Sequence, residues 1–142
     1  MREVMALGEA VVLLALASLA IRLLPFRWLV RLMGRTDPSL SRSWSDPLDV
    51  RRAVERGSRR LPWRTLCFQE GLTAHWMLRR RGLPSRLHYG IRQQAGSLTA
   101  HVWVDVKGLA VIGEEEPVSA HAPVAVYPSL APRRLPLARG SG

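Results

Sequence analysis

The chain has 142 residues, of which 47% are hydrophobic and 23% are charged. This is the composition of a globular protein of one domain, and it excludes a fully disordered chain. Lysine and arginine outnumber aspartate and glutamate by 21 to 11, so the net charge is +10. This charge favours anionic partners, unless the arginines merely cover a solvated surface. A single cysteine excludes an intramolecular disulfide and a Cys-rich zinc finger, and it is typical of the reducing cytoplasm.

The N-terminal region is predicted to be helical. Residues 10–21 are apolar and contain neither proline nor glycine, and residues 26–33 form a second, shorter helical pattern that carries Arg27 and Arg31. The first run has 12 residues, whereas a membrane-spanning helix needs about 18 or more. Two interpretations remain open. The helices either belong to the core or form a docking face for a membrane surface or a partner protein.

A third helix is predicted over residues 48–56. The segment 36–49 has the composition of a loop, and within it Asp46 and Pro47 form a typical helix start, an N-cap followed by a first-turn proline. Gly57 follows the last helical position and is expected to end the helix.

A fourth helix is predicted over residues 66–80. It ends in a run of arginines followed by Gly82, which places basic side chains at the negative end of the helix dipole and glycine just beyond it. One face of this helix carries mostly small side chains, so another element is expected to pack closely against it. That face comprises Cys67, Gly71, Ala74 and Leu78.

The pattern of residues 85–112 is that of strands. Three strands are predicted, over residues 85–91, 98–106 and 109–112, and Lys107-Gly108 forms a tight turn between the last two. Together with the helices, they predict an α+β fold in which the helix that carries the cysteine packs on a small antiparallel sheet.

The chain is predicted to divide at residue 116. Residues 1–116, including the N-terminal helices at 5–34, form the domain. Proline recurs from Pro117 onward, so residues 117–142 are predicted to be an extended, poorly ordered tail.

Cys67 and His101 are the candidate nucleophile and base. Cys67 lies in the first turn of the fourth helix, where unpaired backbone N–H groups and the helix dipole favour a thiolate. His101 lies on the second strand, 34 residues later. A nucleophilic thiol needs a base within hydrogen-bond reach, and a strand packed against the start of a helix can supply one.

The geometry of the hairpin predicts the acid that orients His101. If Lys107 and Gly108 are the central residues of the turn, Asp105 faces Ala110 and His101 faces Glu114. Opposed side chains have Cβ atoms about 4.5–5.5 Å apart, whereas Asp105 lies about 13 Å along the strand from His101. Glu114 is therefore the predicted third member. A register slip of one residue would place Gly113 or Glu115 there instead, and an exposed acidic loop at 114–116 is the alternative.

The remaining histidines are poorer candidates for the base. His75 lies on the same helix as Cys67, about 12 Å along its axis. His88 could line a cleft or pack in the sheet, and His121 falls in the predicted tail. No His, Cys or carboxylate spacing is that of a metal site, and no Gly-rich phosphate loop is present, so neither a metal nor a cofactor is predicted. The Cys67 N–H is the expected oxyanion donor, with the indole of Trp63 as a weaker second candidate.

Four segments follow one another at short, regular distances: LCFQEGL at 66–72, LRRRGLPSRL at 78–87, GI at 90–91 and AHVWVDV at 100–106. This succession resembles the small transglutaminase-like proteins of lasso-peptide biosynthesis, the leader peptidases called B proteins. The likeness covers about residues 5–116, including the Leu-Pro-Phe step at 24–26.

The resemblance implies a papain- or transglutaminase-like core with a Cys-His-Asp triad. Cys67 and His101 match the family's motif positions. Where the family usually carries an aspartate, this chain has Ile112-Gly113-Glu114. The implied activity is that of a cysteine protease that removes the leader peptide from a lasso-peptide precursor. The implied partners are the precursor, a small leader-binding protein and an asparagine-synthetase-like cyclase, but not nucleic acid.

Two other functional classes fit the same scaffold. One is a non-catalytic adaptor that binds a protein or an anionic surface, and the other is an acyl transferase that joins amines to acyl groups. Alkylation of the single thiol distinguishes the enzymes from the adaptor, and the product mass distinguishes hydrolysis from transfer.

Overall fold

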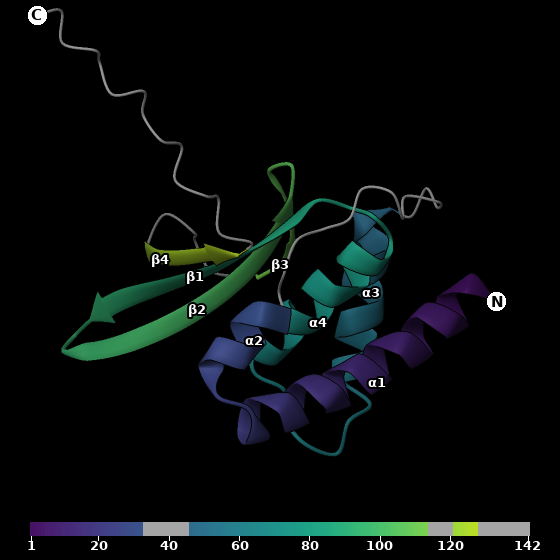
Figure 1. Ribbon diagram of the computed structural model, residues 1–142, viewed down its shortest axis with the longest axis horizontal. Helices are drawn as coiled ribbons and strands as arrows, with labels where there is room; N and C mark the ends of the chain where they lie inside the picture. The colour runs from purple at the N-terminus through teal and green to yellow at the C-terminus, as the bar shows by residue number, and fades with distance from the viewer. Residues whose placement is uncertain (33–45, 114–120, 128–142) are drawn as a thin grey trace, which may run out of the picture.

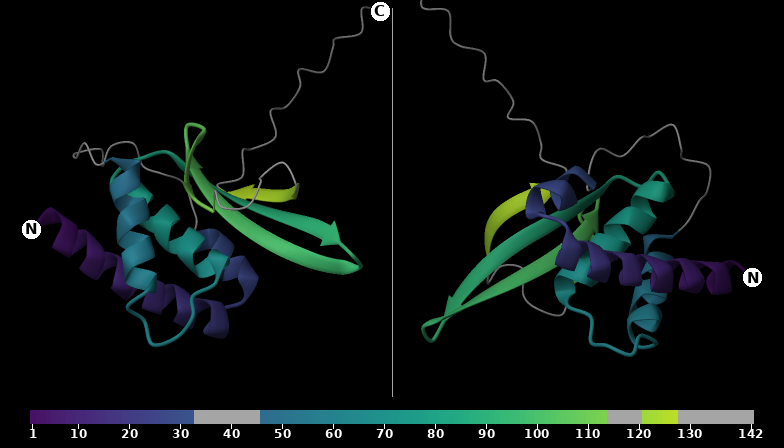
Figure 2. Two further views of the ribbon diagram at one scale, coloured as in Figure 1. Left: turned by 180° about the vertical axis from the view of Figure 1, so that it is seen from behind. Right: turned by 60° about the horizontal axis from the view of Figure 1, so that its bottom comes forward.

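The computed structural model describes residues 1–32, 46–113 and 121–127. The described part of the chain has four helices and one sheet of four antiparallel strands, ordered β3-β2-β1-β4. The helices lie on one side of the sheet, with α4 against β1 and β2 (Figures 1 and 2). The predicted α+β class is confirmed. The elements are α1 (Arg2–Leu23), α2 (Phe26–Leu32), α3 (Pro47–Ser58), α4 (Cys67–Arg80), β1 (Ser85–Gln94), β2 (Ser97–Val106), β3 (Leu109–Ile112) and β4 (Ala122–Tyr127).

Helix α3 begins as its sequence predicts. Asp46 is the N-cap, and its Oδ1 accepts a 3.0 Å hydrogen bond from the backbone N–H of Leu48. Pro47 occupies the first turn, where its missing N–H costs no helical hydrogen bond. The helix continues to Ser58, two residues beyond the predicted end, because Gly57 is buried against α1 rather than ending the helix.

Helix α4 ends where the sequence predicts and begins one residue later than predicted, with Leu66 as its N-cap. It runs from Cys67 to Arg80, and Gly82 adopts a left-handed φ of +70° just beyond it. The N–H of Leu83 bonds to the carbonyl of Leu78 and the N–H of Gly82 to that of Arg79, which is the pattern of a Schellman cap. The small-residue face packs closely on the sheet, as expected. A Cβ added to Gly71 would lie 2.7 Å from Cγ1 of Val102.

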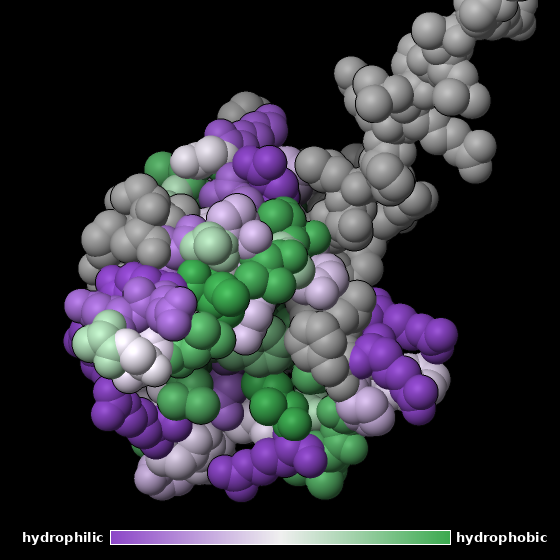
Figure 3. Space-filling model, turned by 90° about the vertical axis from the view of Figure 1, so that its left-hand side faces the viewer, coloured by the Kyte–Doolittle hydropathy of each residue, from purple (hydrophilic) through white to green (hydrophobic). Residues whose placement is uncertain are grey.

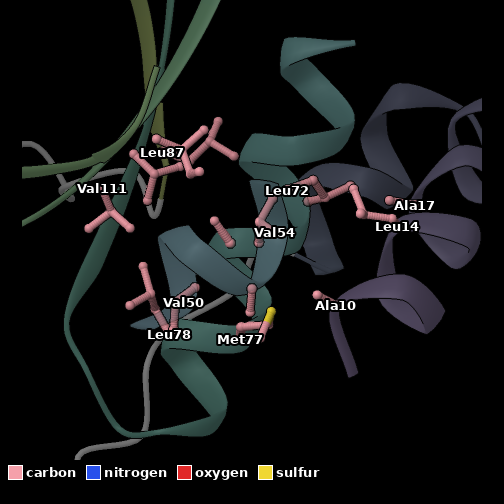
Figure 4. Close-up of a cluster of buried hydrophobic side chains, with 14 of the residues drawn as sticks. Ala10, Leu14, Ala17, Val50, Val54, Leu72, Met77, Leu78, Leu87 and Val111 are labelled. Atoms are coloured by element: carbon pink, nitrogen blue, oxygen red, sulfur yellow. The ribbon is translucent and has the colours of Figure 1, made fainter. Parts of the chain in front are cut away.

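The hydrophobic core lies between the helices and one face of the sheet (Figure 4). Side chains alternate along each strand, so alternate residues of β1 and β2 face the helices. Leu87 of β1 is paired with Val104 of β2, and both are fully buried in this core. The other face of these strands carries polar and aromatic side chains. The core residues labelled in the figure are Ala10, Leu14, Ala17, Val50, Val54, Leu72, Met77, Leu78, Leu87 and Val111.

Helix α1 is longer than the predicted apolar run. It spans 22 residues and is long and apolar enough to cross a membrane by length and composition alone. The sequence-based expectation that this helix is too short to span a membrane is therefore wrong. The helix starts at Arg2 rather than at Ala10, which makes it long enough. However, Ala10, Leu14 and Ala17 are fully buried against the rest of the protein, so one side of α1 belongs to the core.

Strand β4 corrects the prediction of an extended tail from residue 117. Ala122–Tyr127 pairs antiparallel with β1 and forms an edge of the sheet. Pro123 lies opposite Gly90. A proline cannot donate the backbone hydrogen bond that a central strand needs on both sides, but it is tolerated in an edge strand. A proline-rich composition therefore does not exclude this strand. Residues 117–120 and 128–142 of the predicted tail lie outside the described residues.

Candidate active site

Cys67 is the first residue of α4 and is partly exposed. Two side-chain hydrogen bonds hold the chain at this point. The backbone N–H of Leu66 donates to Oε1 of Gln69 at 2.7 Å, and the Thr65 hydroxyl donates to Oε1 of Glu70 at 2.6 Å. Because the first N–H groups of a helix have no partner within it, the thiol sits where the helix end favours negative charge.

His101 lies in the middle of β2, and the environment of its ring defines its tautomer. Its Nε2 bonds to the carbonyl oxygen of Gly113 at 2.8 Å. A carbonyl oxygen only accepts hydrogen bonds, so Nε2 carries the hydrogen, and Nδ1 of the neutral ring is left as the proton acceptor. The ring is nearly buried and stacks on Trp103 at a centroid distance of 5.9 Å, with His121 at 5.0 Å.

The structure does not bring the predicted nucleophile and base together. Among the described residues, no hydrogen bond joins the thiol of Cys67 to His101. Val102 faces Gly71 of α4, so the alternation of side chains places His101 on the other face of β2. Proton transfer between Cys67 and His101 therefore requires a closer approach than this structure has. Long or absent catalytic hydrogen bonds are common in enzymes without substrate.

The predicted register holds only near the hairpin turn. Val106 pairs with Leu109 and Asp105 with Ala110, as expected, but Val104 pairs with Ile112 because a bulge follows Val104. The pairing is therefore shifted by one residue at Val104, so the uninterrupted register from which Glu114 was placed opposite His101 does not hold. The one-residue slip toward Glu115 that the sequence left open has the same sense. Glu114 itself lies outside the described residues. Among the described residues, the hydrogen-bond acceptor for the His101 ring is the backbone carbonyl of Gly113.

Asp105 belongs to a second polar cluster on the same face of the sheet. Its Oδ1 lies 2.6 Å from Nε2 of His88, and its Oδ2 accepts from Arg86 at 2.9 Å and from the backbone N–H of Gly108 at 2.8 Å. Burial raises the pKa of Asp105, but the hydrogen bonds from Arg86, His88 and Gly108 outweigh it and hold that pKa below its usual value. The same pairing raises the pKa of Arg86.

The pairing of β1 with β2 accounts for this cluster. His88 lies opposite Trp103, and their rings stack at 5.1 Å with an angle of 4° between them. Arg86 lies opposite Asp105. Sequence analysis missed the His88–Asp105 pair. Counting outward from the turn at Ala95-Gly96 predicts that Arg86 faces Asp105 and that His88 faces Trp103, which makes His88 and Asp105 diagonal neighbours on one face of the sheet.

The structure also shows where Trp63 and His75 lie, two residues that the sequence offered only as weak candidates for the site. The indole N–H of Trp63 donates to Oγ of Ser18 at 3.3 Å, so Trp63 is tied to α1 instead of pointing at an oxyanion. His75 is fully buried, and its Nδ1 bonds to Oγ of Ser85 at 2.8 Å, which ties α4 to β1. Within residues 1–32, 46–113 and 121–127, no three His, Cys, Asp or Glu side chains form a metal-binding group.

Comparison with protein families gives one match. A family model described as the transglutaminase-like superfamily matches residues 10–126, which includes α1 from Ala10 onward, all of α2, and β4 up to its last residue but one. The chain therefore belongs to the transglutaminase-like superfamily. No curated protein and no solved structure matches the chain.

Proposed function

We propose that this member of the transglutaminase-like superfamily is a thiol peptidase that removes the leader from a lasso-peptide precursor. The observation that carries the proposal is the tautomer of His101. With Nε2–H held by the Gly113 carbonyl, Nδ1 is the ring nitrogen that can accept a proton. His101 lies on the strand that packs against α4, but on the face of that strand away from the helix, so the reaction requires its ring to move toward Cys67. The likeness of the motifs at 66–72 and 100–106 to the B proteins supports the choice of substrate.

In the proposed reaction the Cys67 thiol transfers its proton to Nδ1 of His101, and the sulfur attacks the scissile carbonyl carbon. The carbonyl π electrons move onto oxygen, where the first N–H groups of α4 stabilise the charge. When the carbonyl reforms, the C–N bond breaks and the leaving nitrogen takes the proton from the imidazolium. A water molecule, deprotonated by His101, then attacks the thioester, which releases the acid and regenerates the thiol.

The test incubates the chain with a lasso-peptide precursor and a leader-binding protein, sought among the genes that neighbour its own, and follows the product by mass spectrometry. We expect cleavage with addition of one water. We expect Cys67→Ala to abolish this cleavage and His101→Ala to slow it by a factor of about 10² or more. His75→Gln is the matched histidine control, provided that its folded fraction equals that of the wild type.

Each outcome of this test decides a different part of the proposal. No cleavage by the wild type contradicts the leader-peptidase activity, and cleavage by Cys67→Ala contradicts the thiol mechanism. A product with an amine joined to the acyl group would instead favour the acyl transferase. Alkylation of the single thiol by iodoacetamide at neutral pH gives a readout without any peptide. His101→Ala should slow this labelling if the two groups approach one another in solution.

A further inference from the structure

Helix α1 carries an apolar stripe on its exposed side, interrupted only by Gly8 between Met5 and Val12. The stripe recurs at intervals of three, four and seven residues, which places its members on one face of the helix. Each of these side chains is at least half exposed, whereas the core side of the same helix is buried. The stripe comprises Met5, Val12, Leu16, Leu19 and Leu23.

Within the part of the chain that the structure describes, no element covers this stripe. A soluble domain rarely leaves a row of large apolar side chains in water, and such a surface marks a binding face. Figure 3 shows one side of the molecule, where hydrophobic residues gather in a patch bordered by hydrophilic ones. The other side of α1 is fixed in the core by Leu14 and Ala17, which are fully buried. Crossing a membrane would expose these residues, so α1 can only lie along a surface.

The C-terminal end of α1 and the adjoining helix α2 supply positive charge and an aromatic ring. Arg22, Arg27 and Arg31 are exposed, and among the described residues none of them pairs with a carboxylate. Trp28 is 46% exposed, and the guanidinium of Arg31 lies 4.8 Å from the centre of its ring. An apolar face with arginines and tryptophan at its edge is typical of a helix that lies in the interface of an anionic membrane.

We propose that α1 and α2 dock the protein on an anionic lipid surface. The apolar stripe enters the boundary between headgroups and acyl chains, Trp28 lies at headgroup level, and Arg22, Arg27 and Arg31 contact lipid phosphates. The charge favours lipid over a second copy of this chain, because two such faces would bring like charges together. This docking is independent of the proposed peptidase activity.

The test measures co-sedimentation of the full chain with vesicles of phosphatidylcholine alone and of phosphatidylcholine mixed equally with phosphatidylglycerol. We expect binding to the mixed vesicles and weaker binding to the neutral ones. The double variant Leu16→Glu with Leu19→Glu should bind at least about tenfold more weakly. Its control, Leu98→Glu with Leu109→Glu, adds the same two charges at exposed leucines of the sheet and should bind like the wild type.

A second pair of variants tests the arginines without altering the stripe. Arg22→Gln with Arg27→Gln should weaken binding to mixed vesicles more than Arg59→Gln with Arg60→Gln does, and NaCl at about 0.5 M should reduce the difference. Circular dichroism checks that every variant is folded. Should Leu16→Glu with Leu19→Glu unfold, Leu16→Gln with Leu19→Gln takes its place.

Three results would overturn the proposal. One is the absence of wild-type binding to mixed vesicles. Another is equal binding by the stripe variant and its control. The third is a wild-type dimer, seen by sedimentation velocity, that becomes monomeric in Leu16→Glu with Leu19→Glu while no vesicles bind, which would assign the stripe to self-association.

Discussion

The Nε2–H of His101 donates a 2.8 Å hydrogen bond to the carbonyl oxygen of Gly113, so the orientation of an imidazole is set by the backbone of a glycine. Gly113 has a φ of +86°, and a Cβ at this position would lie 2.6 Å from the carbonyl oxygen of Val102. Only glycine fits this conformation and this space without strain. Position 113 therefore links the stability of the sheet to the tautomer of His101.

We expect Gly113→Ala to lower the free energy of unfolding by about 2–4 kcal/mol, because it combines a strained φ with a steric clash against β2. Gly108→Ala is the matched control. Gly108 has a φ of +87° but open space around it, so only the backbone term of about 1 kcal/mol applies. Urea unfolding of the two variants measures the difference. Equal losses would show that the close approach to Val102 has no energetic consequence.

The same hydrogen bond predicts a small role for a carboxylate next to His101. Because Nε2–H already has an acceptor, we expect Glu114→Gln to lower the rate of precursor cleavage by less than about tenfold. We expect His101→Ala to lower it by about 10² or more. The hairpin argument from the sequence predicts instead that Glu114→Gln lowers the rate more than Asp105→Asn does. Rates on one precursor, with equal folded fractions, distinguish the two.

Asp105 should make stability depend on pH. Its pKa is held below the usual value in the folded protein, so its contribution is fully present above the unfolded pKa of about 4 and is lost as the pH falls through the folded pKa. We expect Asp105→Asn to cost about 2 kcal/mol at pH 7 and progressively less in acid.

The control for this prediction is Asp49→Asn. Asp49 is exposed and pairs with Arg52 on the surface of α3, so its loss should change stability by less than about 0.5 kcal/mol. Urea midpoints measured between neutral pH and pH 3 give both curves. Parallel curves for the wild type and Asp105→Asn would contradict the lowered pKa.

The two sides of α1 should respond differently to truncation. Leu14 is fully buried, and we expect Leu14→Ala to cost about 2–5 kcal/mol because it leaves a cavity. Leu16 is 50% exposed, so Leu16→Ala should cost less than about 1 kcal/mol. Thermal and urea unfolding test both. For the same reason, removal of residues 1–34 should unfold the protein rather than only impair docking. A folded truncated chain would show that α1 is dispensable to the core.

Several elements of this protein follow from the sequence alone. The start of α3 is defined by Asp46 and Pro47, and the end of α4 by its arginines and Gly82. The two faces of β2 follow from the alternation of His101 and Trp103 with valines. Each of these features depends on residues within a few positions of one another, so local propensity, capping and side-chain direction suffice to predict them.

Other features depend on pairing between distant segments and were decided only by the tertiary structure. The bulge after Val104 has no sequence signature, yet it shifts the pairing of β2 with β3 by one residue. The acceptor that holds His101 is a backbone carbonyl, a group that every residue carries and that no pattern of side chains reveals. Strand β4 forms because β1 offers it an open edge, despite its proline. The apolar run at the N-terminus is similarly hydrophobic on all sides of the helix. Only the packing of α3 and α4 against it therefore determines that Leu14 lies in the core and Leu16 on the surface.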